Sequence, residues 1–185
     1  AWWLYKLQSS NATRSEVEIG KVLRQIGWPA AVYEYVGSYR TRVRSENFVG
    51  KGEFFEPYDS LRYMFDDTSD EDDVILTNLS SLGASFRRDW KRILAADAFF
   101  MNTDRHMRNF GVIRSSKTGD ILRLAPNFDN NQAYTANPMG YSSSMLRLFI
   151  RSADAEDREN LQILADGCKG NKYLSQACQA YADLS

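Results

Sequence analysis

The sequence has 185 residues, of which 43% are hydrophobic and 25% are charged, and its net charge is −1. This composition is typical of a folded domain and excludes wholesale disorder. The near-neutral charge gives no electrostatic signal for a nucleic-acid partner. No apolar run approaches the length that a membrane span requires. With one histidine and two cysteines in the chain, a zinc cluster is nearly excluded.

Residues 1–8 alternate between two faces and predict a short strand. Lys6 has apolar neighbours on its own face, so its ammonium group either reaches solvent past an edge strand or points into a site. Residues 13–26 carry apolar side chains at helical spacing and predict a helix that stops at Gly27. Glu16 borders the apolar stripe, and the simplest interpretation is a first-turn carboxylate near the positive end of the helix.

Three more strands are expected over 30–36, 39–49 and 53–56, joined by glycine-containing turns. With the preceding strand and helix they predict one small mixed layer. Residues 66–73 then place six carboxylates in eight positions. The glycine and terminal glutamate of an EF-hand are missing, so we expect a solvated surface loop rather than a calcium site.

The pattern after this acidic loop is mainly helical. Apolar side chains at helical spacing predict a helix over 85–101, and Asp97 falls within its apolar stripe. A buried carboxylate needs hydrogen-bonding partners, so we expect a polar group to pack against it. The remaining expected elements are a hairpin over 110–114 and 120–125 and helices over about 153–166 and 172–183.

The densest group of polar residues is Asn-Thr-Asp-Arg-His-Met-Arg-Asn-Phe-Gly at 102–111, followed at 126–130 by Pro-Asn-Phe-Asp-Asn. Asn109 lies five residues after Asp104, and the hairpin between the two segments brings Asp129 back towards them. Amide and carboxylate oxygens suit Mg²⁺, whose shell is completed by phosphate oxygens and water. We therefore expect Asn109 and Asp129 to hold a metal ion and Asp104 to accept the proton of a hydroxyl group.

The spacing Asp-x4-Asn matches the protein-kinase catalytic loop. The longer string, with Asp-Arg-His and the downstream Leu-Ala-Pro-Asn-Phe-Asp, resembles the HipA-like kinases. Residues 15–16 and 27–30 are similar to the Asn-Glu and Leu-Gly-Leu-Pro segments of that family. The resemblance implies an α+β, protein-kinase-like fold with two lobes, in which Asp129 binds the metal. It also implies that Lys6 is the strand lysine of the ATP site and Glu16 its helix partner.

The resemblance implies an ATP- and Mg²⁺-dependent phosphotransferase, most simply a Ser/Thr protein kinase in the bacterial cytoplasm with an antitoxin-like partner. Two alternatives stay open: the same architecture with a lipid or small-molecule acceptor, and a non-catalytic module that binds nucleotide. Residues 1–65 would form the small lobe, 66–73 the acidic loop and 74–185 the helical lobe. The first residue is Ala rather than Met, so we expect a piece of a longer protein, truncated at its N-terminus, and export is also open.

His106, the only histidine, is grouped with Asp104 and Asn109 as a catalytic candidate. Three interpretations compete: it anchors the catalytic loop, with Asp97 as one candidate partner, it assists proton transfer or stabilises a phosphate, or it is exposed and idle. We favour the anchoring role and expect Arg105 to form an ion pair inside the loop. The sequence leaves open whether Cys168 and Cys178 form a disulfide, and a reducing compartment is the simpler interpretation.

Overall fold

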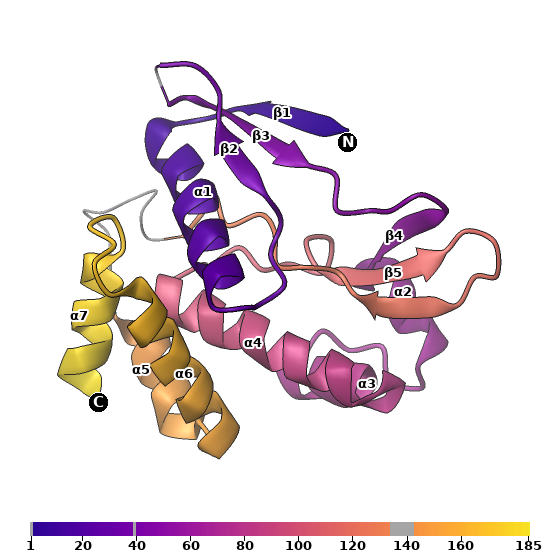
Figure 1. Cartoon of the computed structure of the whole chain (residues 1–185). Coiled ribbons are helices and arrows are strands. Elements are labelled where there is room, and N and C mark those ends of the chain that lie inside the picture. Colours follow the sequence, from indigo (N-terminus) through magenta and orange to yellow (C-terminus); the bar gives the residue numbers. More distant parts are fainter. Residues whose placement is uncertain (1, 39, 134–142) are drawn as a thin grey trace.

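The computed structural model describes residues 2–38, 40–133 and 143–185 and shows two small antiparallel sheets beside a mainly helical half (Figure 1). The first sheet has the order β1-β3-β2, with β1 at Trp3–Leu7, β2 at Tyr33–Tyr35 and β3 at Arg42–Glu46. The second has the order β4-β5-β6, with β4 at Glu53–Pro57, β5 at Gly111–Ser115 and β6 at Ile121–Leu124. The predicted α+β class is confirmed.

The helices are α1 (Ser10–Gln25), α2 (Tyr58–Leu61), α3 (Asp72–Leu82), α4 (Ala84–Phe100), α5 (Ser144–Ser152), α6 (Ala155–Cys168) and α7 (Ser175–Leu184). Helix α1 begins earlier than the sequence predicts, because the Ser9 hydroxyl caps it by accepting a 3.1 Å hydrogen bond from the Ala12 amide. It ends at Gln25, and Gly27, whose φ of 78° suits glycine, turns the chain away just after it. The sequence patterns do not predict helices α2, α3 and α5.

Strand β4 contradicts the prediction of a single N-terminal layer. Its residues pair with β5, from Glu53 opposite Ser115 to Pro57 opposite Gly111, rather than with β3. Glycine is required at 111, because a Cβ there would lie 2.1 Å from the Glu56 carbonyl oxygen. The pairing ties the segment before α2 to the strand that directly follows residues 102–110, the candidate catalytic loop, which is called the catalytic loop below.

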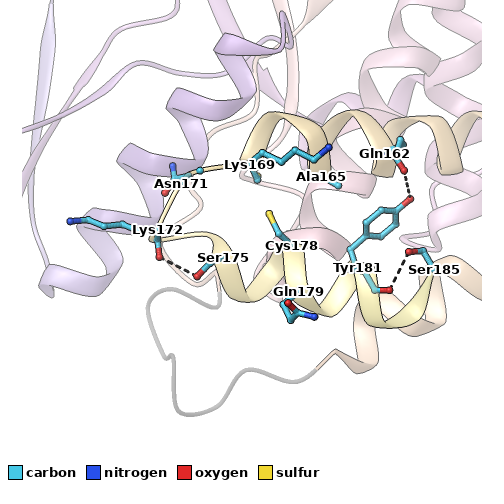
Figure 2. Close-up of a pocket in the computed structure, with 13 residues that line it drawn as sticks. Gln162, Ala165, Lys169, Asn171, Lys172, Ser175, Cys178, Gln179, Tyr181 and Ser185 are labelled. Atoms are coloured by element: carbon cyan, nitrogen blue, oxygen red, sulfur yellow. Dashed lines mark hydrogen bonds between the residues drawn. The ribbon is translucent and has the colours of Figure 1, made fainter.

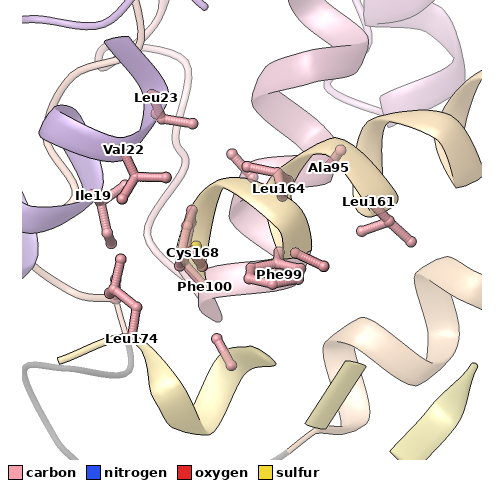
Figure 3. Close-up of a cluster of buried hydrophobic side chains, with 14 of the residues drawn as sticks. Ile19, Val22, Leu23, Ala95, Phe99, Phe100, Leu161, Leu164, Cys168 and Leu174 are labelled. Atoms are coloured by element: carbon pink, nitrogen blue, oxygen red, sulfur yellow. The ribbon is translucent and has the colours of Figure 1, made fainter. Parts of the chain in front are cut away.

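Helix α1 joins the first sheet to the helical half. One side of it packs Val17 against Ala31, Tyr33 and Val43 of the sheet region. The other side belongs to the larger core drawn in Figure 3, which includes Ile19, Val22 and Leu23 of α1, Phe99 and Phe100 of α4, and Leu161 and Leu164 of α6. Helix α6 approaches closely at Gly167, where a Cβ would lie 2.4 Å from the Ile26 Cγ2 atom. The position of α1 is therefore fixed from both sides.

A second core holds the N-terminal part of α4. The Trp90 ring lies against the Phe110 ring with centroids 4.3 Å apart, and Tyr58 stacks on Phe110 with centroids 5.1 Å apart. Ile75 and Leu79 of α3 complete this core. The acidic segment before it is mostly exposed, but its last two residues form the first turn of α3. No helix among the described residues is long and apolar enough to cross a membrane.

Candidate active site

Lys6 projects from β1 towards α1 and meets two carboxylates. Its Nζ lies 2.9 Å from Glu16 Oε1 and 3.3 Å from Asp129 Oδ1. The second Glu16 oxygen accepts a 2.7 Å hydrogen bond from Gln8 Nε2. Glu16 is fully buried in the middle of α1, so its interpretation as a first-turn carboxylate is wrong. The expected contact between the strand lysine and the helix glutamate is present.

The electrostatics of this cluster keep Lys6 charged. Burial lowers the pKa of Lys6, but Tyr33, Glu16 and Asp129 together raise it above its ordinary value. Burial raises the pKa of Glu16, and the neighbouring Lys6 opposes that shift. Burial and the charge of Glu16 raise the pKa of Tyr33 to about 12. An ammonium group held among acidic groups in this way is suited to binding phosphate oxygens.

Asp129 is positioned by its own backbone. Its φ of 61° is left-handed, a conformation that Asp adopts more readily than most residues. Its amide donates a 3.1 Å hydrogen bond to the Tyr33 hydroxyl. Just before it, Asn127 forms a parallel bridge with Ala30, in which the Ala31 amide donates to the Asn127 carbonyl at 2.9 Å. The segment after α1 thus fixes the segment that carries Asp129.

Arg105 is the centre of the polar core beneath the catalytic loop. Its Nε and Nη2 donate to both oxygens of Asp97 at 2.8 Å, a bidentate pair in which the side chains are 7% and 2% exposed. Its Nη1 donates to the carbonyls of Asn109, at 3.1 Å, and Phe128, at 2.7 Å. The expected ion pair of Arg105 is therefore present, and it holds the catalytic loop beside the segment that carries Asp129.

Three asparagines that the sequence analysis gave no role complete this polar core. Asn102 Nδ2 donates to Asp97 Oδ1 at 3.2 Å and to Asn130 Oδ1 at 3.3 Å. Asn130 Nδ2 donates to Asn127 Oδ1 at 3.0 Å, and Arg105 Nη2 reaches both amide oxygens at 3.2 Å. The sequence held one signal for this network, the number of asparagines in the two polar segments. Buried amide groups need hydrogen-bonding partners, so several asparagines close together could have indicated a shared polar core.

The catalytic loop presents Asp104 to solvent. Its backbone carbonyl accepts a 2.6 Å hydrogen bond from Asn109 Nδ2 and a 3.0 Å hydrogen bond from the His106 amide. The Asp104 carboxylate makes no hydrogen bond to a described residue and is exposed. Asn109, by contrast, is 3% exposed, and its Oδ1 is buried without a partner among the described residues.

The buried Oδ1 atom of Asn109, which has no partner among the described residues, bears on whether a metal ion fits here. A buried amide oxygen without a donor is unfavourable unless something else satisfies it, and a cation does so. Arg105 donates to the backbone carbonyls of both Asn109 and Phe128, so it holds the two segments together. Asp129 directly follows Phe128 in the chain. No group of three His, Cys, Asp or Glu side chains suited to a metal occurs among the described residues. One amide and one carboxylate fit Mg²⁺, which takes most of its ligands from phosphates and water.

His106 forms no hydrogen bond or ion pair with Asp97, so Asp97 is wrong as its suggested partner in an anchoring role. The ring is exposed, and its Nδ1 accepts a 3.2 Å hydrogen bond from the Arg108 amide. Arg105 makes the contact instead, because a guanidinium group can bind both carboxylate oxygens and still donate to neighbouring carbonyls. A role of His106 in proton or phosphate transfer stays a prediction.

A separate cavity of about 590 Å³ lies between α6 and α7, and Figure 2 shows Lys169, Cys178 and Tyr181 around it. None of the predicted site residues lines it. Both cysteines are free thiols, which answers the question the sequence left open. The hydrogen bond with Cys178, together with burial, raises the pKa of the Cys168 thiol.

No protein-family model and no curated protein matches the sequence. Among solved structures, the proinflammatory kinase CtkA of Helicobacter pylori matches 98% of this chain and 86% of its own, with a TM-score of 0.71 and 14% identity. HipA of Shewanella oneidensis MR-1, solved with HipB and operator DNA, matches with a TM-score of 0.58 and 12% identity. That match covers 96% of this chain, which spans about half (52%) of the HipA chain. The chain therefore shares the fold of these two structures, of which CtkA is described as a kinase and HipA as part of a toxin-antitoxin system.

Proposed function

We propose that this protein is an ATP- and Mg²⁺-dependent phosphotransferase that acts on a Ser or Thr hydroxyl of a protein, in the manner of the HipA-like kinases. The observation that carries the proposal is the convergence of Lys6, Glu16 and Asp129, with Nζ–oxygen distances of 2.9 and 3.3 Å. These residues come from a strand, a helix and a distant loop. A structural salt bridge needs two partners, whereas this arrangement gathers three. Arg105 joins it to the loop that carries Asp104 and Asn109, because its Nη1 donates to the carbonyls of Asn109 and Phe128.

Each group then has a distinct task. Lys6, held by Glu16, would bind phosphate oxygens of ATP, as the corresponding ion pair does in protein kinases. Asn109 and Asp129 would hold Mg²⁺, which neutralises charge on the phosphates. The exposed Asp104 would orient the acceptor hydroxyl and take its proton. Arg105 does not touch substrate in this scheme; it positions the loop that carries Asp104 and Asn109.

The test of ligand binding is a thermal-shift titration with ATP, with and without Mg²⁺. ATP should raise the melting temperature, and Mg²⁺ should raise it further, because each ligand binds the folded state. Asp129→Asn, which retains a side chain that tolerates a left-handed backbone, should abolish the increment from Mg²⁺. A wild type that ignores ATP overturns the proposal. Binding of ATP without phosphate transfer would support the non-catalytic alternative instead.

We also propose an antitoxin-like partner in the bacterial cytoplasm, because the HipA structure that this fold resembles contains HipB. The partner would be a protein that co-purifies with this chain in stoichiometric amount from its native cells. Size-exclusion chromatography of the natively expressed protein tests this. A single peak at the mass of the chain alone contradicts it.

A further inference from the structure

A groove of about 760 Å³ lies next to the catalytic loop. Helices α3 and α5 form its walls, one face of α4 forms its floor, and residues 102–107 close one end. Lys6, Glu16 and Asp129 do not line it. The groove is therefore separate from the proposed nucleotide site, but it borders the loop that presents Asp104.

Apolar side chains line much of this groove without being covered. Leu76 of α3, Leu94 of α4 and Phe149 of α5 contribute to its surface and are only half-buried. Leu148, on the α5 wall, is 63% exposed. Apolar surface gathered in a concave site beside polar residues is characteristic of a binding surface rather than of scattered exposed residues.

The uncompensated charge of the groove is negative. Its cations are already paired: Lys91 with Asp154 and Asp157, Arg87 with Glu156, and Arg105 with Asp97. Asp72 and Asp73 of α3 line the groove and form no ion pair with a described residue. Burial and the neighbouring carboxylates Asp73 and Asp97 raise the pKa of Asp72, as expected where negative charge accumulates.

The floor also contains an unsatisfied donor. Trp90 lines the groove and is 1% exposed, and its indole Nε1 has no hydrogen-bond partner among the described residues. Buried indole N–H groups usually find an acceptor. The described part of the groove therefore combines apolar surface, carboxylates without an ion pair and a free N–H donor. A ligand with apolar stems, cationic groups and carbonyl oxygens matches these three features in turn.

We propose that this groove binds a segment of the acceptor protein that is rich in Arg or Lys and in apolar residues. Lysine and arginine have apolar stems that would lie on Leu76 and Leu148, while their charged ends reach Asp72 and Asp73. The neighbouring catalytic loop would then receive the Ser or Thr of the same segment at Asp104. As a statement about the acceptor, this inference rests on the proposed kinase function.

The test is a binding measurement that does not require catalysis. The probe is a short fluorescein-labelled peptide with one Ser flanked by Arg and Leu, and its binding to the full chain is followed by fluorescence anisotropy. Asp72→Lys/Asp73→Lys should weaken binding about tenfold, because two attractions become repulsions. Because both residues also stabilise the first turn of α3, Asp72→Asn/Asp73→Asn provides a gentler variant, with a loss of about threefold. Circular dichroism verifies that each variant is folded.

Glu159→Lys is the matched control, because Glu159 is exposed on α6 and does not line the groove. It should leave peptide affinity unchanged, and a peptide with Glu in place of Arg should not bind the wild type. Equal affinity of the wild type and both folded α3 variants overturns the inference, even if the protein phosphorylates other acceptors. Loss of ATP binding with normal peptide binding would instead count against the proposed function alone.

Discussion

Arg105→Met tests the role of the polar core in shaping the catalytic loop. The substitution leaves Asp97, only 2% exposed, without its bidentate partner, and it also frees the carbonyls of Asn109 and Phe128. Removing one partner of a buried ion pair costs about 3–5 kcal/mol. For a chain of this length that loss lowers the melting temperature by roughly 6–20 °C.

Urea unfolding monitored by circular dichroism measures the free energy directly. Lys169→Met is the control, because its ion pair with Asp166 is exposed on both sides, at 76% and 53%, and such pairs contribute about 1 kcal/mol or less. The double variant Arg105→Met/Asp97→Asn should lose less than the sum of the two single losses, because the partners act as a unit. If Arg105→Met destabilises the fold no more than the control does, the reasoning about this core is refuted.

Three further predictions concern the nucleotide site, pH dependence and strand pairing. Lys6→Met should weaken ATP binding about tenfold or more in calorimetry, whereas Lys172→Met, on an exposed lysine, should not; equal affinities would remove Lys6 from the site. The hydrogen bond from Lys91 lowers the pKa of Asp154 from 3.8 to about 2, so this pair stabilises the fold above about pH 4 and its contribution disappears as the pH falls towards 2. In Asp154→Asn the free energy of unfolding should therefore depend less on pH between about 4 and 2. The same pH dependence in the variant and the wild type would contradict the assignment. Gly111→Ala should lower the free energy of unfolding by about 1–3 kcal/mol, because its Cβ would meet the Glu56 carbonyl. Gly50→Ala should cost much less, because its Cβ meets only the flexible Glu53 carboxylate. Similar losses in the two variants would show that β4 does not exclude a side chain at position 111.

Local patterns in the sequence predicted much of the fold. The helix over 85–101 and the hairpin after the catalytic loop each depend on side-chain periodicity and turn residues that lie close together in the chain, and the structure has both. The partner of β4 could not be predicted in this way. That strand pairs with residues 111–115, which are more than 50 positions away in the chain. The sequence feature connected with this pairing is Gly111, where β4 comes too close for a Cβ, and a single glycine does not identify its partner strand.

The candidate site shows the same division. The spacing between Asp104 and Asn109 is local, so the sequence alone is enough to indicate the catalytic loop. The sequence also indicates that Asp97 needs a polar partner, but local reasoning could not choose between Arg105 and His106, which are neighbours in the same loop. The geometry decides this: Arg105 points inward and pairs with Asp97, while His106 is exposed.

The central claim is that Asp104 serves as the base in phosphoryl transfer, and transfer of labelled γ-phosphate from ATP to Ser- and Thr-containing peptides tests it most directly. The comparison is between the wild type and Asp104→Asn. Because the Asp104 carboxylate is exposed and makes no hydrogen bond to a described residue, the variant should fold and bind ATP normally. Its turnover should fall about a hundredfold or more, whereas Asp183→Asn, on α7, should retain full turnover. Equal turnover of Asp104→Asn and the wild type would contradict the account.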